Sequence, residues 1–212
     1  MAPPASMTVA RQRVRLAIGP TEQAAIVMVT MTLAYCLSRY HPLSAPWAWT
    51  CVVFFLGIPL VVMAVLRVRP SQWGLGLGHW RWTVGFTLAG LASATALLVL
   101  CRELPALQTF YRPLRPSPAS FWPWLMLLAV EMVAWEFFWR GFGLFGLEPA
   151  LGRLAVFVPM IPFALAHLHK PEIETLTSIA GAVILGFIVL KCRSIWPAFI
   201  VHFYFYAAIF FV

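Results

Sequence analysis

The sequence predicts an all-α protein, a polytopic bundle of about seven transmembrane helices, and three observations lead to that prediction. First, 62% of the 212 residues are hydrophobic and only 10% are charged, whereas a soluble domain carries about 25% charged residues. Second, the mean hydropathy is +0.86, which means that lipid must solvate part of the apolar surface. Third, the apolar residues form runs, several of which approach the roughly 20 residues of a membrane span.

The chain is expected to begin with a polar tail, residues 1–23, followed by one membrane domain, residues 24–212. The tail contains Arg11, Arg13 and Arg15 and lacks the apolar stretch of a cleaved signal peptide, so the first span is expected to act as an uncleaved anchor. Because lipid leaves backbone groups unsatisfied in an open sheet, each apolar run is interpreted as a helix. The runs lie at residues 24–38, 46–66, 83–101, 121–139, 154–167, 175–190 and 195–212.

The connectors indicate how the chain is oriented. The tail, the connector 67–82 and the connector with Lys191 and Arg193 fall on one side of the membrane and are rich in basic residues, which favours a cytoplasmic N-terminus. The longest connector, residues 102–120, contains three arginines and argues against this orientation. From its prolines it is either an amphipathic or a disordered surface segment. The same topology explains the net charge of +8 better than a nucleic-acid partner does.

Two compositional features bear on the cell that makes the protein and on its thiols. Arginine outnumbers lysine, which favours a bacterial source and therefore a bacterial inner membrane. The four cysteines show no paired or metal-ligand spacing, so they are expected to be free thiols in the membrane.

Ionisable residues inside the apolar runs carry the functional information, because a charge in the membrane costs a few kcal/mol or more and usually faces a partner or a wet cavity. Glu136 and Arg140 lie one helical turn apart and are expected to pair. Glu131 has no basic partner one turn away in its own helix. An ion pair that only neutralises two charges is the alternative for Glu136 and Arg140.

Histidines occur in two later runs. His167 ends an apolar run and shares a helix face with Phe163, whereas His169 is expected to point nearly the opposite way, so that the two do not chelate one metal. His202 lies in the last run with Tyr206 one turn on. Each histidine alone is also compatible with an ordinary hydrogen bond to a neighbouring helix.

Together and in this order, the three segments resemble the CPBP family of intramembrane proteases, also called the CAAX-protease or Abi family. The family pattern is E-E-x-x-x-R, then F-x-x-x-H, then H-x-x-x-N or D, each on a separate helix. The matching residues here are Glu136 with Arg140, Phe163 with His167, and His202. The resemblance covers residues 121–206 and implies a helical membrane peptidase.

Two positions depart from the family pattern. The first glutamate, the family's usual water-activating base, is replaced by Trp135, and the final Asn or Asp is replaced by Tyr206. Glu131 is the candidate substitute, since it lies one turn from Trp135, about 6 Å along the axis and about 40° away in direction. Tyr206 retains a hydroxyl that can donate a hydrogen bond.

The resemblance implies peptide hydrolysis without a covalent intermediate. A carboxylate of Glu131 or Glu136 activates a water molecule together with His167, and His202 with Tyr206 donates to the developing oxyanion. Arg140 either holds Glu136 or binds a substrate carboxylate. The chain contains no Asp and no Ser–His pairing stands out, which disfavours serine-protease chemistry. Glu136, His167 and His202 have the chemistry to bind zinc, but their spacing requires no ion, so no cofactor is expected.

The expected partners are the lipid bilayer and a peptide or protein substrate in the membrane, with no nucleic acid. A bacterial member of this family removes C-terminal sorting tails, matures secreted peptides or confers bacteriocin self-immunity, and the sequence does not choose among these. The alternative from another class is a catalytically inactive membrane scaffold or immunity protein, which Trp135 favours. A small transporter is a third interpretation.

Overall fold

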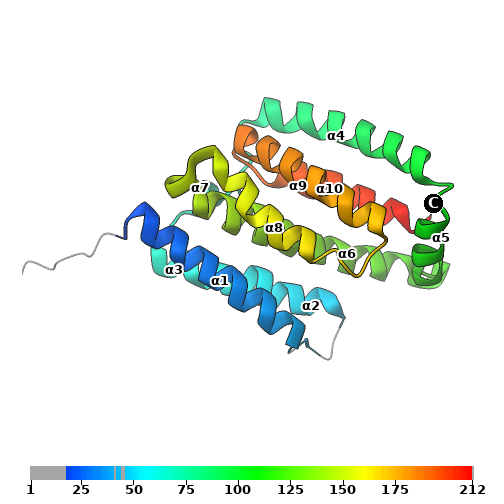
Figure 1. The fold of residues 1–212 in the computed structure, drawn as a ribbon, viewed down its shortest axis with the longest axis horizontal. Coiled ribbons are helices and arrows are strands. Elements are labelled where there is room, and N and C mark those ends of the chain that lie inside the picture. Colours follow the sequence, from blue (N-terminus) through cyan, green and yellow to red (C-terminus); the bar gives the residue numbers. More distant parts are fainter. Residues whose placement is uncertain (1–17, 41, 44–45, 212) are drawn as a thin grey trace, which may run out of the picture.

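The computed structural model describes residues 18–40, 42–43 and 46–211, and these form a bundle of helices. Most of the expected polar tail therefore lies outside the described residues. Within the described part, seven helical rods run along roughly the same axis, as predicted (Figure 1). Their bounds are α1 (Pro20–Tyr40), α2 to α3 (Trp47–Leu66), α4 (Trp80–Cys101), α6 to α7 (Phe121–Leu151), α8 (Phe157–Leu165), α9 (Glu172–Cys192) and α10 (Trp196–Ile209).

By length and composition, four segments of the described chain are long and apolar enough to cross a membrane. They are Trp47–Leu66, Trp80–Cys101, Glu172–Cys192 and the long segment Pro118–Leu165, while Trp196–Ile209 is a shorter apolar helix. Large apolar side chains such as Leu100 and Val65 are more than 70% exposed, which suits contact with lipid rather than water. The protein is therefore a multi-pass membrane protein.

The charges at the ends of α9 stabilise that helix. Glu172 and Glu174 lie in its first turn and Lys191 in its last turn, where each charge opposes the helix dipole. The helix then ends at Arg193, whose φ of 55° is left-handed, and this turn leads directly into α10.

The fourth rod is longer than the sequence predicted. The apolar run was expected to end at Trp139, but α6 (Phe121–Glu136) continues into a π-helical segment, η5 (Phe137–Phe145), and then into α7 (Gly146–Leu151). The prediction ended the helix at the charge of Arg140, yet this charge is buried and paired, so the helix continues through it. Gly152, with a φ of 56°, then reverses the chain into α8.

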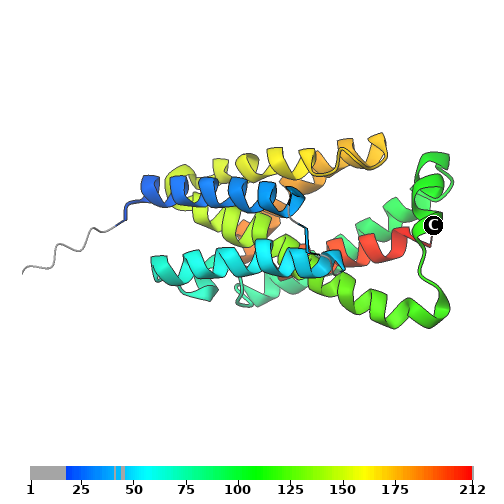
Figure 2. The ribbon, with the colours of Figure 1, turned by 90° about the horizontal axis from the view of Figure 1, so that it is seen from below.

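The longest connector is ordered and contains a short helix, α5 (Pro105–Tyr111), followed by two 3₁₀ turns. Of the two alternatives for this segment, the structure shows a helical one. Tyr111 at its end is 1% exposed and packs on Phe210 and Tyr206 of the α10 end. The connector thus covers the end of the bundle at which α10 finishes (Figure 2).

Packing divides the bundle into layers. Helix α10 packs against α4 and α6, α9 packs against α8, and α1 packs against α7. The core between these layers is aromatic, with Phe55, Phe137, Phe138, Trp139 and Phe142 all at most 2% exposed. This rigid core holds the C-terminal half of the fourth rod, and with it Glu136 and Arg140. The four cysteines are free, as predicted.

Candidate active site

Glu136 is the centre of a buried polar cluster. Its carboxylate is 0% exposed and accepts two hydrogen bonds from Nη1 of Arg140, at 2.6 and 2.7 Å. The pairing of Glu136 and Arg140 is thus confirmed. Nδ1 of His202 lies 2.6 Å from Oε1 of the same carboxylate. The guanidinium also lies over the ring of Phe163, 4.6 Å from its centroid, so the cluster joins the fourth rod to α8 and α10.

The protonation of His202 follows from this contact. A carboxylate paired with arginine is ionised and only accepts, so Nδ1 of His202 carries the hydrogen. The other ring nitrogen, Nε2, is then left for a different partner. His202 also lines a cavity, which makes that nitrogen the polar atom that the ring presents there.

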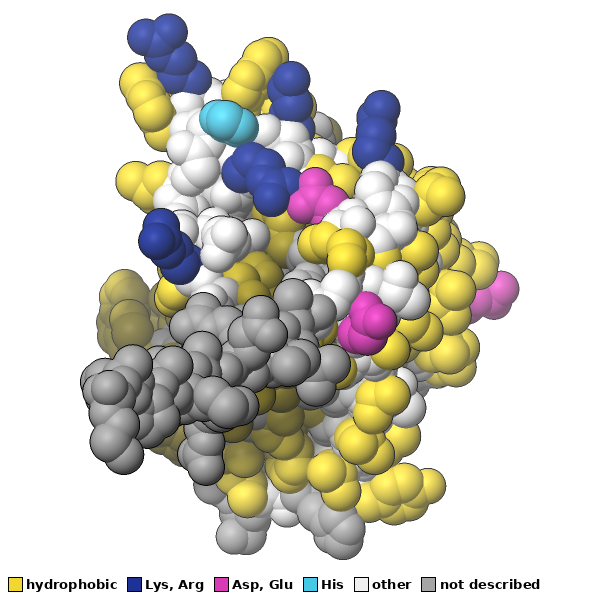
Figure 3. Space-filling model, turned by 90° about the vertical axis from the view of Figure 1, so that its left-hand side faces the viewer, with side chains coloured by type: hydrophobic (Ala, Val, Ile, Leu, Met, Phe, Trp, Pro, Cys, Tyr) yellow, Lys and Arg dark blue, Asp and Glu magenta, His cyan; other side chains and the backbone are white. Residues whose placement is uncertain are grey.

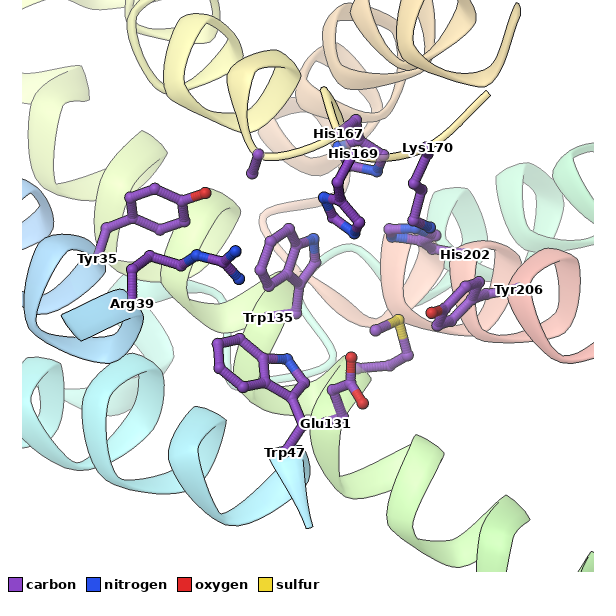
Figure 4. A pocket seen from close by; sticks show the side chains of 12 residues that line it. Tyr35, Arg39, Trp47, Glu131, Trp135, His167, His169, Lys170, His202 and Tyr206 are labelled. Carbon is purple, nitrogen blue, oxygen red and sulfur yellow. The ribbon is translucent and has the colours of Figure 1, made fainter. Parts of the chain in front are cut away.

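The cavity has a volume of about 230 Å³, and one water molecule needs about 10–15 Å³ of free space. Four of the predicted site residues line it, namely Glu131, His167, His202 and Tyr206. They come from α6, from the turn after α8 and from α10, and they surround one space (Figure 4). The remaining two predicted residues, Glu136 and Arg140, do not line this cavity and are buried.

His167 lies in a turn and not inside a helix. Helix α8 ends at Leu165, and Nδ1 of His167 bonds the carbonyl of Phe163 at 2.8 Å. Because a carbonyl only accepts, Nδ1 is the donor, and a neutral ring keeps an unprotonated Nε2. The turn also corrects a prediction: His169 does not point away from His167, because the two are not on one helix, and both line the cavity.

Glu131 and Trp135 both line the cavity, one turn apart on α6. The indole of Trp135 lies with its ring centroid 6.3 Å from that of His167, so it occupies the neighbourhood in which the family places its first glutamate. Within the described chain, Glu131 forms no hydrogen bond and no ion pair. Its carboxylate is therefore available to water or to a ligand in the cavity.

Tyr206 is held by aromatic and cationic neighbours. Its ring lies 6.5 Å from that of His202 and 6.4 Å from that of Tyr111, and Nζ of Lys170 lies 4.2 Å from its centroid. Lys170 donates in turn to Oε1 of Glu174 at 2.7 Å. Tyr111 donates to Oε2 of Glu174, and burial, followed by the charge of Glu174, raises the pKa of Tyr111, so this hydroxyl keeps its proton.

Several lining residues were not predicted as part of the site. Helix α1 contributes Tyr35 and Arg39, α2 contributes Trp47, and the turn after α8 contributes His169 and Lys170. Burial, together with the charges of Lys170 and Arg39, lowers the pKa of His169, which keeps its ring neutral at neutral pH. The only sequence signal was the position of His169 and Lys170 beside His167; for α1 there was none, since it lies outside the three motifs.

Metal ligation finds little support among the residues that the structure describes. They contain no group of three His, Cys, Asp or Glu side chains placed to hold one ion. Of the three zinc candidates, Glu136 has both oxygens engaged by Arg140 and one also by His202. The donor set therefore does not fit a zinc ion without the loss of these bonds.

The fold and the cavity define a class of protein: a multi-pass helical membrane protein with carboxylate and imidazole groups gathered around one cavity of about 230 Å³. Comparison with known families shows which family part of the chain resembles. The family model of type II CAAX prenyl endopeptidase Rce1-like proteins matches residues 117–208, close to the segment 121–206 that carries the motifs. This confirms the resemblance to the CPBP family, and residues 117–208 are the Rce1-like part of the chain. Neither a curated protein nor a solved structure matches the chain.

Proposed function

We propose that the protein is an intramembrane endopeptidase that hydrolyses a peptide bond near the terminus of a membrane-associated or secreted protein. The family match supports intramembrane endopeptidase activity at the level of the family. The observation that carries the proposal for this chain is that Glu131 and His167 line one cavity large enough for water, while the carboxylate of Glu131 has no partner among the described residues.

In the proposed reaction, a water molecule in the cavity gives a proton to Glu131, and Nε2 of His167 accepts its second hydrogen bond and orients it. The water oxygen attacks the carbonyl carbon of the peptide, and the carbonyl oxygen becomes an oxyanion. The C–N bond then breaks, and the proton held by Glu131 passes to the leaving amine. No bond forms between enzyme and substrate.

His202 and Tyr206 are proposed to donate to the oxyanion. Nδ1 of His202 is engaged by Glu136, which leaves Nε2 as the ring atom that would donate to the oxyanion. The hydroxyl of Tyr206 is the second donor. Removal of one such donor typically lowers the rate by about 10²–10³-fold.

Arg140 is proposed to position Glu136 and not to bind substrate. It is 4% exposed and donates through Nη1 to both oxygens of Glu136. Its guanidinium therefore does not face the cavity. The cations that line the cavity are Arg39 and Lys170. We propose that they, and not Arg140, bind an anionic group of the peptide. We also propose that the protein lies in a bacterial inner membrane with a cytoplasmic N-terminus.

The test is cleavage by Glu131→Gln in cells, followed by mass spectrometry of the termini of membrane and secreted proteins. Loss of the base lowers the rate by about 10²–10⁴-fold, so the processed termini should disappear. Glu172→Gln is the matched control, because Glu172 is exposed at the start of α9, and its pattern should equal that of the wild type. Identical termini in both variants would reject the proposal.

The second candidate is a catalytically inactive binding protein of the same family. One observation favours it: Trp135 occupies the position of the family's first glutamate and lines the cavity. In that case, Glu131→Gln, His167→Ala and His202→Ala would leave all processed termini unchanged although each variant inserts in the membrane.

A further inference from the structure

The cavity lies toward one end of the bundle. Its lining includes Arg39 in the last turn of α1, Trp47 at the start of α2, and His167, His169 and Lys170 in the turn between α8 and α9. These positions share the end at which connectors 102–120 and 166–171 lie (Figure 1). We call it the cavity end.

The other end of the bundle, the basic end, is closed by contacts between connectors. The backbone N–H of His79 donates to the carbonyl of Cys192 at 2.7 Å, and that of Ile195 donates to Gly74 at 3.0 Å. The hydroxyl of Ser194 donates to the carbonyl of Gly76 at 2.8 Å. Gly78 packs so tightly on the carbonyl of Cys192 that a Cβ there would clash. These contacts oppose entry of a peptide from the basic end.

Basic residues are distributed unequally between the two ends. Beside the basic end, or just before α1 in the sequence, are Arg11, Arg13, Arg15, Arg67, Arg69, Arg81, Arg153, Lys191 and Arg193. Figure 3 shows the molecule from this end, where Lys and Arg side chains gather on the surface. The cavity end has Arg39, Arg102, Arg112, Arg115 and Lys170. Lysine and arginine in short connectors mark the cytoplasmic side of a membrane protein.

Contacts weaken the charge of the cavity end further. Lys170 pairs with Glu174, and Arg102 pairs with Glu103. At the basic end, the described structure pairs Arg193 with Glu148. Among the described residues, five cations of the basic end have no acidic partner, namely Arg67, Arg69, Arg81, Arg153 and Lys191, whereas three cations of the cavity end have none, namely Arg39, Arg112 and Arg115. The difference in unpaired charge has the same sign as the difference in number.

We infer that the cavity opens on the non-cytoplasmic face of the membrane, and that its substrate is therefore an exported segment of a membrane-associated or secreted protein. The statement that the cavity receives a substrate rests on the proposed function. The side of the membrane on which the cavity opens does not depend on it. The contacts that close the basic end lie between the cytoplasmic side and Glu131. Exported polypeptides, in contrast, reach the cavity end directly.

Labelling of single cysteines in intact cells of a bacterial host tests the inference. The background is Cys36→Ala with Cys101→Ala, because these two native thiols are not fully buried, whereas Cys51 and Cys192 are 0% exposed. Ala119→Cys and Leu114→Cys report on the cavity-end connector, and His169→Cys reports on the cavity itself. Ser71→Cys and Leu77→Cys are the matched positions at the basic end, and all five native side chains are exposed.

A membrane-impermeant maleimide that reaches the outer face of the inner membrane should label the first three variants as fully before permeabilisation as after it. It should label Ser71→Cys and Leu77→Cys only after permeabilisation. The reverse pattern, or equal labelling of both ends in intact cells, overturns the inference. Two positions at each end keep the result readable if one variant fails to insert. Since labelling requires no catalysis, absence of proteolysis would reject the proposed function and leave this result unaffected.

Discussion

At the scale of single residues, two glutamates of the same rod have opposite surroundings. Glu136 is fully buried and receives hydrogen bonds from Arg140, with His202 beside it. Glu131, less than two turns earlier, lines the cavity with no partner in the described chain. A carboxylate that is already saturated is a poor acceptor for a proton, whereas an unpartnered one beside water is suited to be a base. Glu136 therefore has a structural role, and Glu131 is the candidate for the chemical one.

The structural role of Glu136 gives the first prediction. Glu136→Gln leaves the guanidinium of Arg140 buried without a counter-charge, and breaking a buried pair costs about 3–5 kcal/mol. The variant should therefore have a markedly lower thermal midpoint of unfolding in detergent than the wild type.

A second Glu–Arg pair in the same chain provides the control. Glu103 pairs with Arg102, but their side chains are 79% and 61% exposed, and such pairs contribute about 0–1 kcal/mol. Glu103→Gln should leave the thermal midpoint nearly unchanged. Equal midpoints for Glu136→Gln and Glu103→Gln would show that the buried cluster does not stabilise the fold.

The second prediction concerns Trp135, which stands where the family has its first glutamate. In the Glu131→Gln background, Trp135→Glu places a carboxylate one turn further along α6 and beside His167, on the wall of the same cavity. Cleavage should rise at least about tenfold above that of Glu131→Gln alone, because a positioned base contributes about 10²–10⁴-fold.

Trp135→Gln in the same background has a similar shape without a base and should give no rise. If Trp135→Glu inserts and folds but gives no more cleavage than Trp135→Gln, Glu131 is not a substitute for the family's base.

The residue pattern predicted some of these contacts and missed others for a physical reason. The pairing of Glu136 with Arg140 was predictable because both lie on one helix, four residues apart. The contact between His202 and Glu136 joins residues 66 positions apart and depends on how α10 packs against α6. Spacing along one helix contains no information about that packing, so only the motif resemblance indicated that these residues meet.

At the scale of elements, the π-helical segment η5 sets the position of the buried cluster. Hydropathy located the fourth apolar run but not its continuation, since Arg140 interrupts the run and Gly141 and Gly143 lower helix propensity. Both glycines are packed: a Cβ on Gly143 would lie 2.8 Å from Cε of Met31 in α1. The segment therefore forms because neighbouring helices approach its glycines closely, and packing of this kind is invisible to local propensity.

The third prediction tests this packing. In Gly141→Ala, the new Cβ would lie 2.5 Å from Cδ2 of Phe137 and 3.1 Å from the carbonyl oxygen of Trp73. Phe137 is fully buried, so the strain of an overfilled core should lower the free energy of unfolding by about 1–3 kcal/mol. Chemical unfolding in mixed micelles measures this difference.

The matched control is Gly85→Ala in α4, where a Cβ would meet no atom within 4 Å. Alanine favours a helix over glycine by about 1 kcal/mol, so this variant should be as stable as the wild type or more stable. The interpretation of η5 is wrong if the two variants change stability by the same amount and in the same direction.

At the scale of the whole molecule, the wall of the cavity includes residues from outside the part of the chain that carries the family motifs. Residues 117–208 match the Rce1-like family model and provide Glu131, His167, His202 and Tyr206. The first two rods lie outside this segment, yet they complete the wall with Tyr35, Arg39 and Trp47. The seven rods and most of the catalytic candidates were predictable from hydropathy and motifs, whereas this wall depends on packing between distant helices.

The last prediction follows from this outer wall. Arg39 is exposed, its guanidinium lies 5.8 Å from the ring centroid of Trp47, and Figure 4 shows it directed into the cavity. If it binds an anionic group of the peptide, as proposed, its contribution is a charge-assisted hydrogen bond made equally in the ground state and the transition state. Such a bond is worth about 1.5–3 kcal/mol, and exposure to solvent places its effect at the lower end, so Arg39→Gln should raise KM about tenfold and leave kcat unchanged. Arg67→Gln, at the basic end, removes the same charge far from the cavity and should change neither constant. A fall in kcat with KM unchanged in Arg39→Gln would instead show that α1 acts on the chemical step, and equal effects of the two variants would show that only net charge matters.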